Sequence, residues 1–157
     1  MEYSSITVER MNILDSERKS GGILLTKDDE KEIINILQSL LPIDTYGYIN
    51  WELIQDKVSV DEPNAIMPVL RERLNKVYAR VYVIWANSKD DDFGFNASLL
   101  KTIHNVEKLV DSDMYIICAK MGYVIHLHPN DDGQIIINIT FTDPGKWDSF
   151  RRKFEED

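Results

Sequence analysis

The stretch MYIICAKMGYVIHLHPNDDGQIIINITF, residues 114–141, decides the fold. It contains three short runs rich in β-branched and aromatic residues, which we expect to be strands over residues 114–119, 123–128 and 134–141. The segments between these runs, KMG and PNDDG, carry residues that tight turns require. The stretch therefore predicts three consecutive strands joined as an antiparallel meander.

The strongest strand signal elsewhere in the chain is YARVYVIWA, residues 78–86. This run is apolar on both faces over residues 81–85, which is typical of a strand buried centrally in a sheet. The segment 43–60 is ambiguous, because its short aromatic pieces fit either an edge strand or a helical turn carrying Trp51 and Ile54. We therefore expect about four strands.

Helical patterns occupy much of the remaining sequence. The clearest is TKDDEKEIINILQSLL, residues 26–41, where Thr26 is a good N-cap and three acidic residues suit the positive end of the helix dipole. Pro42 enforces the stop. Three further helices, one of them capped by Asn96, are expected over residues from about 64–77, 96–113 and 143–157.

The order of these elements predicts the fold class. Helices, a strand, a helix, three strands and a helix make one α+β domain over residues 1–157. We expect a largely antiparallel sheet of about four strands packed with helices. Residues 1–25 carry only a weak pattern, and we expect them to be a loosely attached leading segment.

The charge balance of the chain bears on its partners. The sequence has 27 Asp and Glu residues against 18 Lys and Arg residues, a net charge of -9. Such a field repels phosphate backbones and anionic membrane surfaces, so direct binding of nucleic acid or membrane is disfavoured. A basic protein partner would instead be attracted. The alternative interpretation is that the charge serves only solubility.

The absence of several motifs narrows the function classes. Cys118 is the single cysteine, and inside an apolar run we expect it to be a buried thiol. The N-terminus has no signal-peptide pattern and no apolar run approaches the ~18 residues of a membrane span, so we expect a cytoplasmic protein. Neither a nucleophile motif nor a glycine-rich phosphate cradle is present, and we predict no catalytic residues and no cofactor.

Two histidines one residue apart suggest a possible metal site. On a strand His126 and His128 point to the same face, and Asp131, Asp132 or His104 would complete a ligand set. Against this, the two aspartates sit in a turn sequence, and His104 is expected to face solvent. Strand alternation places the two histidines on the more polar face of the sheet, as expected if this face meets solvent or a partner. A metal-dependent enzyme is therefore kept only as the alternative.

The segment NSKDDDFGF, residues 87–95, is a candidate recognition loop. It places Asp90, Asp91 and Asp92 next to Phe93 and Phe95. Acidic residues would steer a basic partner, and aromatic side chains would anchor it. The alternative is a solvated loop whose phenylalanines are tucked into the core.

The central block YVIWANSKDDDFGFNASLLKTIHNVEKLVDSDMYIICAKMGYVIHLH, residues 82–128, resembles small bacterial immunity proteins of contact-dependent inhibition and related polymorphic-toxin systems. The resemblance is one of overall character, so no family residues are carried over. It implies an acidic, single-domain, cytoplasmic protein without a cofactor. Such a protein binds and neutralises a toxin domain, commonly a nuclease.

These observations lead to one expected function and two alternatives. We expect a non-enzymatic immunity protein that binds a basic toxin domain and occludes its active site. The alternatives are a metal-dependent enzyme using His126 and His128, and an acidic regulator that mimics nucleic acid. The expected contact residues are Asp90, Asp91, Asp92, Phe93, Asp131 and Asp132.

Overall fold

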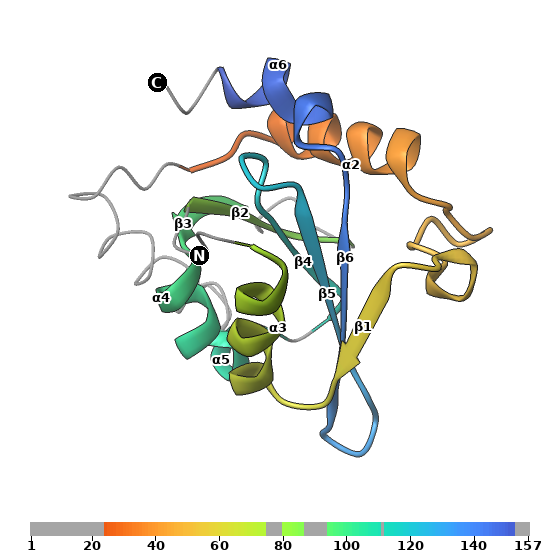
Figure 1. Ribbon diagram of the computed structural model, residues 1–157, viewed down its shortest axis with the longest axis vertical. Helices are drawn as coiled ribbons and strands as arrows, with labels where there is room; N and C mark the ends of the chain where they lie inside the picture. The colour runs from red at the N-terminus through yellow and green to blue at the C-terminus, as the bar shows by residue number, and fades with distance from the viewer. Residues whose placement is uncertain (1–23, 75–79, 87–93, 111, 153–157) are drawn as a thin grey trace, which may run out of the picture.

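The structure, a computed structural model, describes residues 24–74, 80–86, 94–110 and 112–152. Within these ranges six strands form one antiparallel sheet in the order β1–β6–β5–β4–β2–β3 (Figure 1). The predicted α+β class and antiparallel sheet are therefore confirmed. The strands are β1 (Lys57–Val60), β2 (Arg80–Trp85), β3 (Phe95–Ser98), β4 (Met114–Ile117), β5 (Tyr123–Pro129) and β6 (Ile135–Phe141).

The predicted meander is present, because β4, β5 and β6 are successive neighbours in the sheet. Its first turn needs a glycine. Gly122 has a φ of +85°, and a Cβ at this position would stand 2.3 Å from the carbonyl oxygen of Thr142. The Thr142 N–H donates to the Gly122 carbonyl at 2.7 Å, so the two backbones are held at close range.

The ambiguous segment 43–60 contains both structures considered for it. A short 3₁₀ turn, Trp51–Leu53, precedes the edge strand β1. β1 pairs with β6, and Lys57 lies opposite Thr140. The sheet therefore gains a strand at this edge beyond the four that were predicted.

Strand β3, which was not predicted, corrects the sequence analysis. The helix expected over residues 96–113 is wrong at its start, because β3 extends to Ser98 and pairs with β2. Asn96 is not the N-cap but a buried strand residue whose side-chain oxygen accepts from the Arg80 guanidinium. Ser98 caps the helix instead, with its hydroxyl accepting from the Lys101 N–H at 3.3 Å.

The helices are mostly shorter than predicted, except for the first. The predicted cap of α2 is confirmed: Thr26 Oγ1 accepts from the Asp29 N–H, and the Asp29 carboxylate accepts from the Thr26 N–H. A 3₁₀ turn, Pro63–Ala65, leads into α3, and another, Pro144–Trp147, leads into α6. The helices are α2 (Lys27–Leu40), α3 (Ile66–Arg73), α4 (Leu99–His104), α5 (Val106–Leu109) and α6 (Asp148–Arg151).

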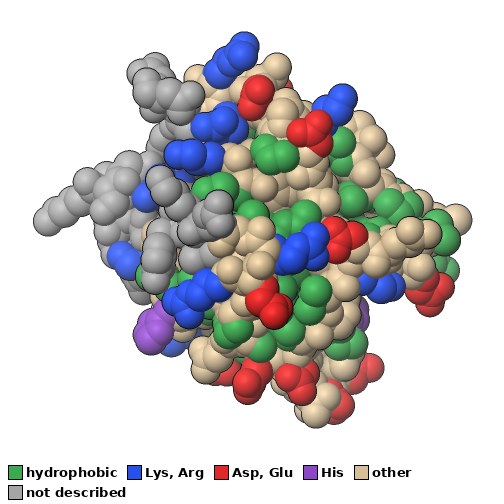
Figure 2. All heavy atoms as spheres, viewed as in Figure 1, with side chains coloured by type: hydrophobic (Ala, Val, Ile, Leu, Met, Phe, Trp, Pro, Cys, Tyr) green, Lys and Arg blue, Asp and Glu red, His purple; other side chains and the backbone are tan. Residues whose placement is uncertain are grey.

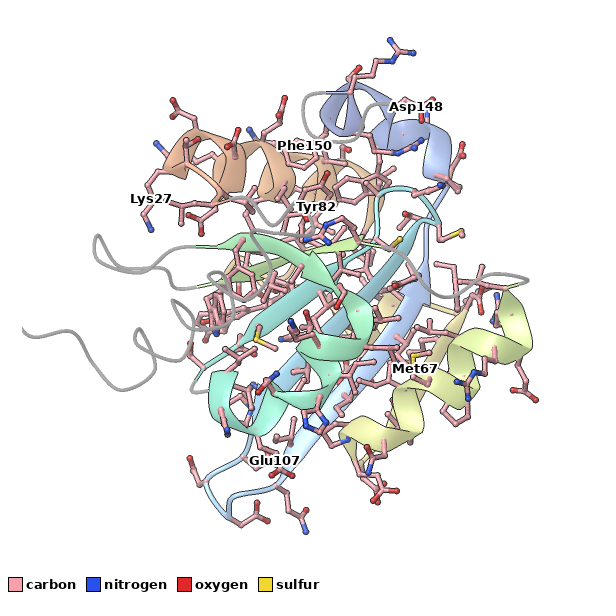
Figure 3. All side chains as sticks on the ribbon, turned by 90° about the vertical axis from the view of Figure 1, so that its left-hand side faces the viewer. Lys27, Met67, Tyr82, Glu107, Asp148 and Phe150 are labelled. Carbon is pink, nitrogen blue, oxygen red and sulfur yellow. The ribbon has the colours of Figure 1, made fainter. Side chains whose placement is uncertain are left out.

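Helices cover the two faces of the sheet unequally (Figure 3). α3, α4 and α5 pack on one face, over the alternate β2 side chains that include Val81 and Val83. α2 and α6 pack on the other face, where Phe150 meets Tyr82 with ring centroids 4.9 Å apart. In Figure 1, α2 and α6 lie at the top of the molecule, and the β5–β6 turn lies at the bottom. On the α2 face, the end near this turn is therefore not covered by a described helix.

Three smaller predictions can be placed in this fold. Cys118 is a free, fully buried thiol, as expected. Of the leading segment, residues 1–23 lie outside the described residues; Leu24 bridges Phe95, and Leu25 is buried. Among the described helices, none has the length and apolar character to cross a membrane.

Candidate functional site

The two histidines of β5 lie on the α2 face of the sheet, as the alternation predicts. They differ sharply in burial, since His126 is 6% exposed whereas the side chain of His128 is 49% exposed. Their cross-strand neighbours on β6 are Asn138 and Ile136, which share the same face. This face is polar only towards the β5–β6 turn, because Val124 joins the apolar cluster beneath α2.

Both ring nitrogens of His126 are hydrogen-bonded. The Trp51 indole N–H donates to His126 Nδ1 over 2.7 Å. Because an indole nitrogen only donates, Nδ1 must carry a lone pair, and the proton of the neutral ring is on Nε2. Nε2 lies 2.7 Å from Asp113 Oδ1, to which it donates. The contacts therefore select one tautomer of His126.

Asp113 joins the two histidines. Its Oδ1 atom also lies 2.7 Å from His128 Nδ1, so one carboxylate oxygen accepts from both rings. Trp51, Asp113, His126 and His128 together form what we call the histidine cluster. His128 is its exposed member. The cluster thus runs from a buried imidazole to the surface.

Aromatic rings enclose the buried imidazole. The Trp51 ring lies nearly parallel to that of His126, with centroids 6.0 Å apart, and the ring of Tyr115 lies 4.8 Å away. Burial lowers the pKa of His126 from its usual value, and the Asp113 carboxylate opposes that shift. His126 is therefore held neutral at physiological pH. This state agrees with the tautomer that the hydrogen bonds require.

The arrangement does not support the alternative of a metal site at His126 and His128. A ligating imidazole must offer a free ring nitrogen, and the two nitrogens of His126 are already bonded. Asp131 and Asp132 are exposed in the β5–β6 turn, and Asp132 Oδ1 accepts from the Gln134 N–H. His104 is exposed on α4, which packs on the opposite face of the sheet. Among the described residues, no group of three or more His, Cys, Asp or Glu side chains is arranged so that it could hold a metal ion.

The predicted contact residues fall into two sets. Asp90, Asp91, Asp92 and Phe93 lie outside the described residues, so their role stays a prediction. Phe95, next to this segment, is fully buried in β3 and its ring lies 6.1 Å from that of Trp85. The core alternative therefore holds for Phe95. The aspartates of the β5–β6 turn are exposed, as a contact role requires.

Sequence reasoning missed two members of the histidine cluster. Asp113 directly precedes β4, and Met114 lies opposite Leu127. The register of the β4–β5 hairpin would therefore have placed Asp113 beside His128. Trp51 is 75 positions from His126 and carries no local signal for this contact.

A comparison with models of known protein families gives a match to this sequence. Residues 9–137 match the family model described as CdiI immunity protein EcoliA0-like. The match begins before α2 and ends within β6, so it spans most of the chain and the whole histidine cluster. A search of curated proteins found no match.

Proposed function

Since the chain belongs to the CdiI immunity protein EcoliA0-like family, we propose that it binds the toxin domain of a contact-dependent inhibition system in the cytoplasm of the cell that makes it. The family implies neutralisation of such a toxin and a role without enzymatic chemistry. The match over residues 9–137 is the observation that carries this proposal.

We infer that the toxin domain is a basic protein of the nuclease class. Nucleases present a positive surface to their phosphate substrate, and this chain carries a net charge of -9. Opposite charges would raise the association rate and make it sensitive to salt. A bound acidic protein would then occupy the substrate-binding surface and block the active site.

The acidic segments serve as the first contacts in this mechanism. Asp131 and Asp132 are exposed at the tip of the β5–β6 turn, where they would meet a partner early. Asp90, Asp91, Asp92 and Phe93 form the second acidic segment. Exposed carboxylates of this kind act on the association rate more than on the stability of the fold.

A growth experiment tests the proposal. The cognate toxin domain is expressed in a sensitive host, alone and together with this chain. Co-expression should restore growth, and the two proteins should purify together. Loss of growth despite soluble chain at molar excess would refute the proposed function.

A further inference from the structure

A strip of the sheet lies open beside the histidine cluster. His128 faces Ile136 across β5 and β6, and Asn138 faces Ser59 across β6 and β1. Residues directly opposite in antiparallel strands share a face, so these four side chains lie on the α2 face. α2 and α6 pack at the other end of this face, against residues such as Val124. We call these four residues the open strip.

The centre of the open strip is apolar and exposed. Ile136 is 41% exposed, although β6 is an interior strand of the sheet. The segment that supplies Trp51 to the histidine cluster also exposes Tyr46 and Leu53. Exposed aromatic and aliphatic side chains beside polar ones are the composition of interface centres.

Acidic side chains surround the apolar centre. A surface hollow of about 490 Å³ opens beside Ile136, and its lining includes Ser59, Asp61 and Gln134 but no basic residue. Asp131 and Asp132 are exposed in the turn that follows His128. Figure 2 shows acidic side chains gathered at the lower end of the molecule, where Figure 1 places the β5–β6 turn. The rim is therefore acidic at Asp61 and at the β5–β6 turn, and the exposed Lys57, two residues before Ser59 on β1, is a basic residue on this face.

The geometry points to the open strip as the docking surface for a cationic protein surface, with Ile136 and His128 at the centre and Asp61 and Asp131 at the rim. This inference rests on the proposed function, because the cationic surface is that of the toxin domain. Lysine and arginine side chains of the toxin would meet the acidic rim. Their aliphatic stems and apolar neighbours would cover Ile136.

Charge favours this occupant over a second copy of the chain. Two chains of net charge -9 repel each other, and the acidic rims would be brought together in a symmetric pair. A cationic partner would be attracted both by the net charge of the chain and by its acidic rim. Self-association through the strip is therefore an outcome that the experiment must separate from docking.

The first pair of variants tests the apolar centre. Ile136→Lys places a charge in the open strip, and Leu100→Lys is its matched control, because Leu100 is 48% exposed on α4 over the opposite face. Affinity for the cognate toxin domain is measured by calorimetry. Ile136→Lys should weaken binding about tenfold or more, the change typical of a central contact. Leu100→Lys should bind as the unaltered chain does.

The second pair tests the acidic rim in a turn where misfolding is not a concern. Asp131→Lys reverses a rim charge, and Glu107→Lys reverses an exposed charge on α5, on the opposite side of the sheet (Figure 3). Asp131→Lys should slow association and reduce its salt dependence, whereas Glu107→Lys should change both much less.

The outcomes distinguish a failure of the docking surface from a failure of the proposed function. Binding by the unaltered chain that neither Ile136→Lys nor Asp131→Lys weakens would overturn the docking surface and leave the proposed function standing. Failure of the unaltered chain to bind the toxin domain would refute the proposed function itself. A homodimer that Ile136→Lys dissociates would also overturn the docking inference.

Discussion

Trp51 donates its indole N–H to His126 Nδ1 over 2.7 Å and joins the segment before β1 to the interior of the sheet. The bond fixes the tautomer of His126, and through Asp113 it fixes the position of the exposed His128. The buried part of the cluster is thus a scaffold, and its outer end belongs to the open strip. This relationship leads to separate predictions for stability and for binding.

Trp51→Phe should destabilise the fold. The substitution keeps an aromatic ring beside His126 but removes the donor to Nδ1, and a buried polar atom left without its partner costs about 1–3 kcal/mol. Urea denaturation measures the loss. Tyr46→Phe is the control, because Tyr46 is exposed and should tolerate removal of its hydroxyl without a change in midpoint. Equal midpoints for Trp51→Phe and the unaltered chain would contradict the role assigned to this bond.

Stability should fall as the pH falls below about 6.5, the value at which a histidine titrates in an unfolded chain. Burial lowers the pKa of His126 in the folded state, so the unfolded state binds more protons between the two pKa values. The contribution of His126 is present above about 6.5 and is lost on acidification through this window. Denaturation midpoints measured from pH 7.5 to 5 test the slope.

Two histidine variants test whether His126 causes this dependence of stability on pH. His126→Gln removes the buried titrating group and should flatten the fall in stability below about 6.5, although its overall stability is lower. His104→Gln alters an exposed histidine on α4 and should keep the slope of the unaltered chain. A slope that His126→Gln leaves unchanged would contradict the assignment of the pH dependence to His126.

Asp113→Asn should lower the pKa of His126 further. The carboxylate of Asp113 raises this pKa against the effect of burial, and an amide keeps a hydrogen-bond acceptor without the negative charge. Titration of the imidazole resonances by NMR measures the shift. An increase in the pKa of His126 in this variant would contradict the contacts described for the cluster.

Two glycines with the same backbone conformation should respond differently to alanine. Gly122 and Gly133 both have φ near +86°, but a Cβ meets the Thr142 carbonyl at Gly122 and nothing within 4 Å at Gly133. Gly133→Ala should cost about 1–2 kcal/mol, the strain of a left-handed residue alone. Gly122→Ala should cost more, because the paired backbone must also move. Thermal unfolding of both variants compares them.

The strands were predictable where local pattern and turn chemistry agree, as in the meander over residues 114–141. β3 was not, because four residues next to a helical pattern give no strand signal of their own. Pairing with β2, with Arg80 opposite Ser98, makes Phe95–Ser98 a strand. This contact is set by the tertiary fold, which sequence periodicity does not contain.

The candidate site was predictable to a similar degree. Alternation alone placed His126 and His128 on one face, and turn chemistry placed Asp131 and Asp132 at an exposed tip. The pairing of both histidines with Asp113 depends on strand register, and the Trp51 contact depends on the path of a segment far away in the chain. The open strip was not predictable, because it exists only where described helices do not cover the sheet.

The most direct test of the central claim is calorimetric titration of this chain with its cognate toxin domain, at low and at physiological salt. The account predicts a complex of one chain per toxin domain whose affinity falls as salt rises, because opposite charges meet at the interface. It also predicts that toxin activity stops at the equivalence point. Absence of a complex, with toxin activity unchanged, would contradict it.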